Sequence, residues 1–178
     1  MNYQGFVVAH DHQSEFPPVV LKRASALEHA ATVQSHTLIP VNVPIENPFI
    51  NRPEDPFFEP KLLRELGWDD REIFNRLTSH PAVVQQFMNT NFWVEVIHHA
   101  HGDNYTPGEL FEHDRDSFME LPISTLTFFS LPQNIADVYA KHYDGVVFKG
   151  MAALRDSTLV ISFRPAAIRY GDEERLPL

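Results

Sequence analysis

The stretch from residue 132 to residue 169 constrains the fold more than any other part of this chain, because it predicts helix, tight turn, strand, loop and strand in that order. Apolar residues recur at helical spacing after Pro132. The turn Tyr143-Asp144-Gly145 ends this helix, and the apolar run at residues 146–148 is typical of a strand that is covered on both faces. A second strand is expected at residues 158–163. These elements predict an α+β fold and carry no direct signature of a reaction.

The first sixty residues are expected to add strands, a short helix and an irregular arm. Apolar runs predict strands at residues 5–9 and 19–22, and alanine-rich spacing predicts a helix at residues 24–32. Residues 37–45 predict an edge strand or one that ends early, because proline lacks the N–H that a sheet ladder needs. The proline-rich residues 46–60 predict no regular structure, but either an extended arm pinned by its phenylalanines or a mobile linker.

A helical pattern occupies the middle of the chain. Apolar residues at spacings of three and four predict short helices between residues 60 and 100. One of them is expected to start at the Asp69-Asp70 pair, because carboxylates suit the positive end of a helix dipole. A further strand is expected at residues 125–129. With no repeat and no domain boundary in view, we expect residues 1–178 to form a single domain with a helical insertion at about residues 60–120.

The charge of the chain argues against one class of function. The 178 residues include 24 acidic and 14 basic side chains, which gives a formal net charge of −10. Sequence-independent binding of nucleic acids depends on Lys and Arg neutralising phosphates, so direct nucleic-acid binding is not expected. The charge is compatible with a basic partner, and the even spread of the acidic residues along the chain favours solubility as its explanation.

The composition also bears on the compartment. The chain has no cysteine, which excludes disulfides, thiol catalysis and cysteine-based metal sites. Its first residues lack the basic and long apolar regions of a signal peptide, and no apolar run approaches the about 20 residues that span a membrane. We therefore expect a soluble, cytoplasmic protein without a membrane partner.

Three ordered segments carry a resemblance to a known family. The first is VVLKRASALEHAATVQ followed by TLIPVNVPIENPF, and the others are YDGVVF and FRPAAI. Together they resemble the ADP-ribosyltransferase-like domains of phage polyvalent proteins and bacterial effectors. Those domains have a strand, an alanine-rich helix, a strand ending in Asn-Pro, a Tyr-Asp-Gly strand and a closing Phe-x-Pro-x-x-Ile pattern. The resemblance covers about half of the chain and implies an ADP-ribosyltransferase-like split β-sheet core, in which two small sheets form a cleft for NAD.

The resemblance also implies an activity. Active members transfer ADP-ribose from NAD to a protein or small target. A first-strand Arg or His and an aromatic ring hold NAD, while a carboxylate stabilises the positive charge that develops on the ribose. In this sequence the roles in binding NAD fall to His10, Arg23 and Tyr143. The catalytic carboxylates implied by the resemblance are Asp156 and Asp144.

The sequence leaves an alternative open. Lys149-Gly150 stands where the family carries an acid after the YDGVVF strand, and Lys22-Arg23 stands where active relatives carry an aromatic residue followed by Ser or Thr. Asp144 can act as a turn residue through its carboxylate instead of as a catalytic acid, and Tyr143 can pack beneath the same turn. The alternative function is a catalytically inactive acidic protein-binding module or inhibitor on the same fold.

No metal site is predicted. His98, His99 and His101 lie close to Asp103, and imidazole is a favoured zinc ligand. The chain lacks a His-Glu-x-x-His motif and a second ligand pair at a diagnostic spacing. These histidines are therefore expected at the surface, without a metal.

Overall fold

A computed structural model describes residues 1–9, 14–151 and 154–176. The chain divides into two compact units, Met1–Pro56 with Phe129–Leu178, and Phe57–Phe128. In the described part of the chain, the first unit holds a mixed sheet of eight strands, and the second is mainly helical with a two-stranded sheet. The predicted α+β class is therefore confirmed. None of the described helices is both long enough and apolar enough to cross a membrane.

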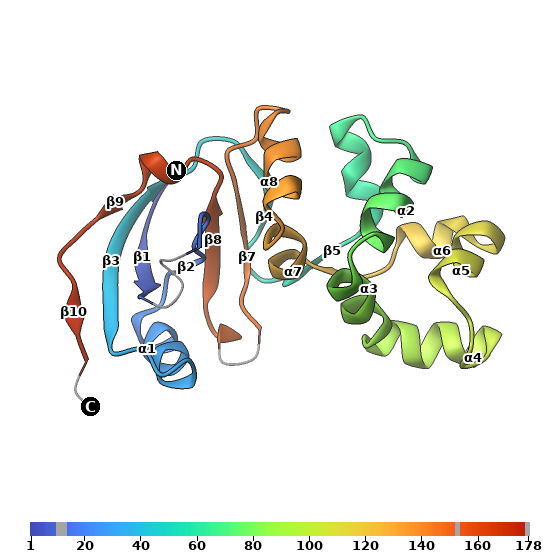
Figure 1. The fold of residues 1–178 in the computed structure, drawn as a ribbon, viewed down its shortest axis with the longest axis horizontal. Coiled ribbons are helices and arrows are strands. Elements are labelled where there is room, and N and C mark those ends of the chain that lie inside the picture. The colour runs from blue at the N-terminus through green and yellow to red at the C-terminus, as the bar shows by residue number, and fades with distance from the viewer. Residues whose placement is uncertain (10–13, 152–153, 177–178) are drawn as a thin grey trace. The chain divides into compact units, whose positions relative to one another are not determined.

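The first unit builds its sheet from segments at both ends of the chain (Figure 1). Its strands follow the order β10-β3-β1-β2-β8-β7-β4, with β9 also pairing with β3, and only the β4–β7 pair is parallel. The elements are β1 Asn2–Val8, β2 Val19–Val20, α1 Arg23–Thr32, β3 Thr37–Pro44, β4 Pro48–Arg52, α8 Pro132–Tyr139, β7 Gly145–Lys149, β8 Thr158–Ser162, a 3₁₀ turn Pro165–Ala167, β9 Arg169–Tyr170 and β10 Glu174–Arg175.

The core of this unit is a hydrophobic cluster that extends across several neighbouring strands of the sheet. Strands β3 and β7 are four places apart in the sheet order, and both contribute side chains to one buried cluster, together with the strands between them. Alternate residues of β3 point into it, as the two-residue period of a strand requires. The cluster consists of Val7, Val19, Ile39, Val41, Val43, Ile45, Val147, Val160 and Ile168.

Strand β7 confirms the clearest prediction. Val146, Val147 and Phe148 are at most 2% exposed, and β7 has β8 on one side and β4 on the other. A strand that is covered on both faces needs an uninterrupted apolar run, which is the pattern in the sequence.

Strand β3 corrects a prediction, since it neither lies at an edge nor ends early. It pairs with β1 along its whole length and with β9 and β10 on its other side. The carbonyl of Pro40 accepts a 2.8 Å hydrogen bond from the backbone N–H of Gly171, in the gap between β9 and β10. The ring nitrogen of Pro40 faces the same gap, so the ladder tolerates a residue without an N–H there.

The proline-rich arm is more regular than expected. Residues Pro48–Arg52 form β4 at the edge of the sheet, and Phe57–Phe58 form β5 in the second unit. Pro48 is the first residue of an edge strand, which is a position where proline is tolerated. The expected pinning by aromatic side chains is confirmed for Phe49 and Phe58, which are buried.

The strand expected at residues 125–129 is a helix instead. Ile123–Ser124 form the short strand β6, and Thr125–Phe129 form helix α7. The hydroxyl of Ser124 accepts a 3.2 Å hydrogen bond from the backbone N–H of Thr127. This local side-chain bond at a helix start outweighs the β-propensity of the Thr and Phe residues that follow.

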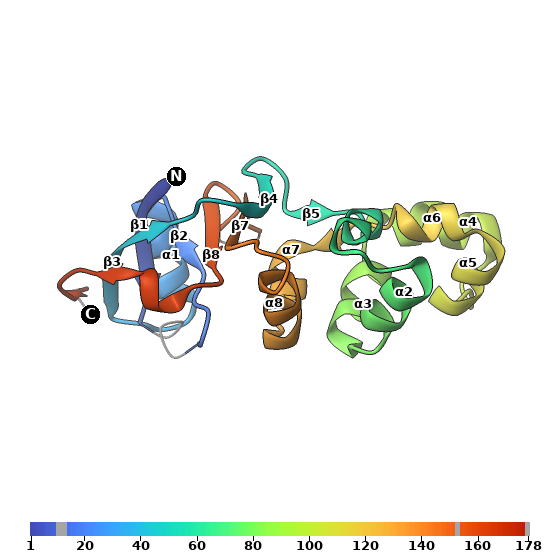
Figure 2. The same cartoon turned by 90° about the horizontal axis from the view of Figure 1, so that it is seen from above.

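The second unit is a set of short helices closed by the β5–β6 pair. The carboxylate of Asp69 accepts a 2.8 Å hydrogen bond from the N–H of Glu72, so a helix does begin at the predicted acidic pair. Figure 2 shows α2 alongside α3. The other elements are a 3₁₀ helix Pro60–Leu66, α2 Asp70–Thr78, α3 Pro81–Met88, a π-helix Phe92–Ile97, α4 His98–His101, α5 Pro107–His113 and α6 Arg115–Met119.

Candidate functional site

The motifs that carry the family resemblance meet in the first unit around the carboxylate of Asp144, which is 6% exposed. Its two oxygens accept hydrogen bonds of 2.9 Å from the backbone N–H groups of Glu46 and Asn47. The guanidinium of Arg164 donates a third bond of 2.7 Å. The Asn-Pro, Tyr-Asp-Gly and Arg-Pro segments are therefore joined through one side chain.

Further contacts strengthen this junction. The side-chain amide of Asn47 donates to the carbonyl of His142 at 2.9 Å, and the ring of Tyr143 packs edge-on against Phe49 with centroids 5.0 Å apart. The backbone of Asp144 bonds to Asn47 and to Phe163. Asp144 thus has a turn role, but its carboxylate binds the backbone of the segment that leads into β4 and not its own. Tyr143 packs beneath the turn.

The turn before β7 needs a glycine at position 145. A Cβ atom there would lie 2.2 Å from Cδ1 of Ile45 and 2.7 Å from the backbone oxygen of Ile161. Close packing between the β3–β4 connection and β8 therefore requires the missing side chain.

Asp156 lies elsewhere, in a polar hollow of about 360 Å³ in the first unit, which we call the Asp156 hollow. It is formed where β7 ends and β8 begins, close to the start of α1. The lining residues are Lys22, Pro53, Glu54, Lys149, Arg155, Asp156, Ser157 and Thr158.

Backbone hydrogen bonds bring these distant segments together. The N–H of Lys149 donates to the carbonyl of Asp55 at 3.2 Å, which holds the β4–β5 connection against β7. The N–H of Lys22 donates to the hydroxyl of Ser157 at 3.1 Å, which fixes the start of α1 beside the β7–β8 turn. Ser157 also accepts from Gly150 at 2.8 Å through its carbonyl. The hollow is thus framed by segments that these hydrogen bonds hold together.

The charges of the hollow are mixed. Three cationic side chains, Lys22, Lys149 and Arg155, share it with the carboxylates of Glu54 and Asp156. None of these five side chains forms an ion pair with another residue that the structure describes. Unpaired cations can bind phosphate oxygens, and a nearby carboxylate can stabilise a developing positive charge.

The structure does not bring the sequence-predicted residues into one pocket. The register pairs Gly145 with Ser162 and Lys149 with Thr158, so Asp144 and Asp156 lie at opposite ends of the hairpin. Four residue steps separate these ends, which corresponds to about 13 Å. Of the described residues predicted to form the site, Asp156 alone lines the hollow.

The binding residues are also dispersed. Arg23 begins α1 and forms an exposed ion pair with Glu174. The ring of Tyr143 is engaged with Phe49. His10 lies outside the residues that the structure describes. The described geometry therefore gives neither Arg23 nor Tyr143 a place at the Asp156 hollow.

Sequence patterns gave no signal for the other charged residues of the hollow. Glu54 stands in a proline-rich segment, and Lys149 was notable only because it replaces an expected acid. Arg155 is next to Asp156, but nothing in its spacing indicates a ligand. The pairing of β4 with β7 and of β7 with β8 places these side chains together.

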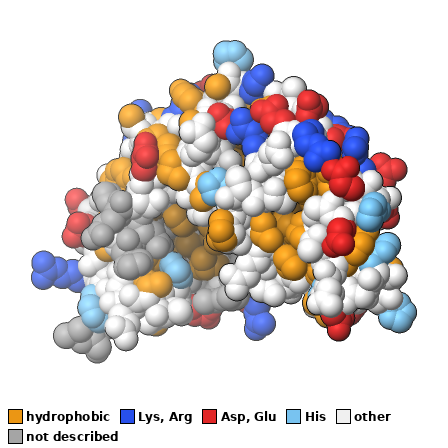
Figure 3. Space-filling model, turned by 45° about the vertical axis from the view of Figure 1, so that its right-hand side comes forward, with side chains coloured by type: hydrophobic (Ala, Val, Ile, Leu, Met, Phe, Trp, Pro, Cys, Tyr) orange, Lys and Arg blue, Asp and Glu red, His pale blue; other side chains and the backbone are white. Residues whose placement is uncertain are grey.

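Several arginines on the surface of the second unit pair with acidic side chains. Arg64 donates two hydrogen bonds, of 2.8 and 3.1 Å, to the carboxylate of Asp70, and Arg71 contacts Glu112 at 2.6 Å. Figure 3 shows basic and acidic side chains intermixed on the face that it presents. Within the described part of the chain, no group of three or more His, Cys, Asp or Glu residues is arranged to hold a metal ion.

Comparisons of this chain with family models, with curated proteins and with solved structures find no match. The structural class of the first unit is therefore described from its fold and its site alone. The first unit is an α+β domain with a mixed sheet, and it carries a polar hollow of mixed charge at one end of its β7–β8 hairpin.

Proposed function

We propose that the first unit is an ADP-ribosyltransferase-like domain that binds NAD in the Asp156 hollow. The observation that carries this proposal is the set of three cations, Lys22, Lys149 and Arg155, around a hollow that also holds two carboxylates. The pyrophosphate of NAD carries two negative charges and suits such a set of cations. The Asn-Pro, Tyr-Asp-Gly and Arg-Pro segments occur in the order that carries the family resemblance, and this order also supports the proposal.

The proposed reaction transfers ADP-ribose to a protein or small target. The bond between the ribose C1 and the nicotinamide nitrogen breaks, and nicotinamide leaves with the bonding electron pair. A nucleophile of the target forms the new bond to C1 and releases its proton to solvent. Asp156, with Glu54 as the second carboxylate of the hollow, would stabilise the positive ribose in the transition state.

The runner-up function is a catalytically inactive acidic module that binds a protein. It is favoured by Asp144, whose carboxylate is occupied by three hydrogen bonds, and by the distance between Asp144 and Asp156. Binding NAD needs fewer precisely positioned groups than stabilising the transition state does. A domain that binds NAD without turnover is therefore an intermediate case between the enzyme and the inactive module. A cytoplasmic location and a protein target belong to both.

Calorimetric titration of the whole chain with NAD tests the proposal. Lys149→Ala and Arg155→Ala should each weaken binding about tenfold, the loss of one charge-assisted hydrogen bond. Lys141→Ala is the matched control, because Lys141 is exposed in the same unit but does not line the hollow.

The carboxylate is tested separately. Asp156→Asn should leave NAD binding within about twofold and lower the rate of nicotinamide release, because a neutral amide cannot stabilise the ribose cation. A titration without heat and without a melting shift at millimolar NAD would remove the enzyme and leave the binding module. Equal weakening by Lys149→Ala and Lys141→Ala would remove the Asp156 hollow as the site.

A further inference from the structure

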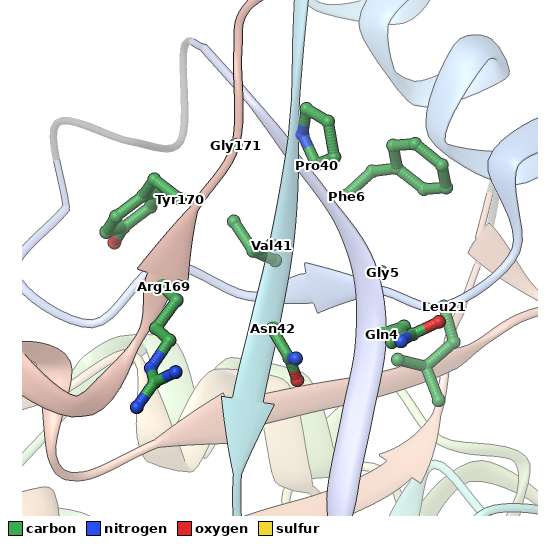
Figure 4. A pocket seen from close by; sticks show the side chains of 10 residues that line it. All are labelled: Gln4, Gly5, Phe6, Leu21, Pro40, Val41, Asn42, Arg169, Tyr170 and Gly171. Carbon is green, nitrogen blue, oxygen red and sulfur yellow. The ribbon is translucent and has the colours of Figure 1, made fainter.

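A second hollow of the first unit lies on β1, β3 and β9, and we call it the Tyr170 hollow. Its volume is about 590 Å³, within the range of about 300–1,000 Å³ usual for small-molecule pockets. It shares no residue with the Asp156 hollow. The lining residues, labelled in Figure 4, are Gln4, Gly5, Phe6, Leu21, Pro40, Val41, Asn42, Arg169, Tyr170 and Gly171.

The hollow extends across β3. Figure 4 shows Arg169 and Tyr170 on one side of this strand and Gln4, Phe6 and Leu21 on the other. Backbone pairing of β9 with β3 holds the first side in place. This arrangement suits an elongated flat ligand with different chemistry at its two ends.

Gly5 is one of the residues that line this hollow. A Cβ atom at Gly5 would lie 2.7 Å from Cγ1 of Val19 and 2.8 Å from the backbone oxygen of Val20. Gly5 therefore lets β2 approach β1 closely and brings Leu21, which follows Val20, to the edge of the hollow.

The charge of the Tyr170 hollow differs from that of the chain. Its lining includes no Asp or Glu, although the chain has 24 of them, and it includes one cation, Arg169. Arg169 is exposed and forms no ion pair with a described residue. An unpaired guanidinium without a neighbouring carboxylate in the same hollow favours a ligand with an acidic group.

The other polar groups indicate what the rest of the ligand carries. Oδ1 of Asn42 is buried and has no hydrogen-bond partner among the described residues, although buried acceptors are normally paired. A ligand N–H would satisfy it once the side-chain amide turns towards the hollow, which Asn42 lines. The ring of Tyr170 is 42% exposed and can pack against a flat ligand.

We propose that the Tyr170 hollow binds a small ligand with one acidic group and a planar ring that carries an N–H donor, and that nucleoside monophosphates are the class that fits this chemistry. The phosphate binds Arg169, the base donates to Oδ1 of Asn42 after the amide has turned into the hollow, and the ring packs beside Tyr170. This site is independent of the proposed NAD site, because the two hollows have no residue in common.

The test titrates the whole chain with UMP, AMP and uridine, followed by nuclear magnetic resonance of the backbone amides. We expect at least one of the two nucleotides to bind in the millimolar range or tighter, with shifts at residues 4–6, 21, 40–42 and 169–171. Uridine, which lacks the phosphate, should bind at least about tenfold more weakly than UMP if UMP is the ligand, because the charge-assisted bond to Arg169 is missing.

Matched arginine variants locate the phosphate. Arg169→Ala should weaken nucleotide binding about tenfold. Arg175→Ala should leave it unchanged, because Arg175 is an exposed arginine of the neighbouring strand β10 outside the hollow. The proposal is overturned if neither nucleotide binds at about 10 mM. It is also overturned if Arg169→Ala and Arg175→Ala change the nucleotide affinity equally. It is also overturned if Lys149→Ala abolishes binding while Arg169→Ala does not, since the ligand would then occupy the Asp156 hollow.

Discussion

The guanidinium of Arg164 donates a 2.7 Å hydrogen bond to the carboxylate of Asp144, which joins the turn before β7 to the turn after β8. The same carboxylate accepts two backbone N–H groups from the segment that precedes β4. The residues that carry the family resemblance are thus residues that hold three segments of the fold together. Such a motif can persist in a domain whether or not the domain is catalytic.

Asp144→Ala should destabilise the first unit strongly. The substitution leaves the N–H groups of Glu46 and Asn47 and the guanidinium of Arg164 without their acceptor. Breaking a buried charged pair costs about 3–5 kcal/mol. Because Arg164 is partly exposed, we expect the free energy of unfolding to fall by about 3 kcal/mol. Chemical denaturation of the whole chain measures it.

The control for this prediction is Asp172→Ala, which removes an exposed carboxylate from the same unit. Its effect should stay within about 0.5 kcal/mol, as for most surface substitutions. Equal effects of the two variants would show that the hydrogen bonds of Asp144 contribute little to stability.

Gly145→Ala should also destabilise the first unit, although alanine is usually compatible with a strand. The added methyl group would lie 2.7 Å from the backbone oxygen of Ile161, which cannot move without disturbing the β7–β8 pair. We expect a loss of about 2 kcal/mol, typical of overpacking. Thermal unfolding of the whole chain gives the comparison.

Gly108→Ala provides the matched control. Gly108 lies in the first turn of α5, and the nearest atom to an added Cβ is Oγ1 of Thr106 at 3.9 Å. Alanine is the better helix former, so this variant should be neutral or slightly stabilising. A melting temperature lowered equally by both variants would refute the steric explanation for Gly145.

Local patterns in the sequence were sufficient for the elements that depend on one segment. The apolar run of β7 and the helix that begins after Asp69 both follow from spacing and capping. They are predictable because the residues that determine them are neighbours in the chain.

Features that depend on partner strands could not be predicted in this way. Pro40 is acceptable inside β3 only because β9 and β10 leave a gap opposite to it. Those two strands come about 130 residues later in the chain. The Asp156 hollow likewise depends on contacts of Lys149 with Asp55 and of Lys22 with Ser157. Spacing along the chain carries no record of such pairings.

A buried hydrogen bond in the second unit gives a third prediction. The indole N–H of Trp93, which is fully buried, donates to Nε2 of His98 at 2.8 Å. His98→Ala removes the acceptor and should lower the free energy of unfolding by about 1–3 kcal/mol, the cost of an unpaired buried donor. The fluorescence of Trp93 should change with it.

His99→Ala is the control, because His99 is the next residue of the same short helix and is exposed. It receives the same gain in helix propensity without losing a bond to Trp93. If His99→Ala changed stability and fluorescence as much as His98→Ala, the Trp93–His98 bond would not be the cause.

The last prediction concerns acid. The carboxylate of Asp114 caps α6 and accepts hydrogen bonds from the hydroxyl and the N–H of Ser117, which hold its pKa below the ordinary value of 3.8. The unfolded chain therefore binds this proton more readily than the folded chain does. The contribution of Asp114 to stability is complete above about pH 4 and is lost as the pH falls through its lowered folded pKa.

Asp114→Asn isolates this charge, because asparagine can still cap the helix through its side-chain oxygen. The variant should be less stable than the native chain near neutral pH, and the difference should shrink as the pH falls below 3.8, where the native carboxylate becomes protonated. Asp70→Asn should show the same convergence, because the side-chain hydrogen bond from Arg64 lowers the pKa of Asp70 in the same sense. Urea denaturation at a series of pH values measures both differences. A difference that stays constant from neutral pH to the acid limit would show that these carboxylates act as caps or packing groups alone, without the charge that their hydrogen bonds stabilise.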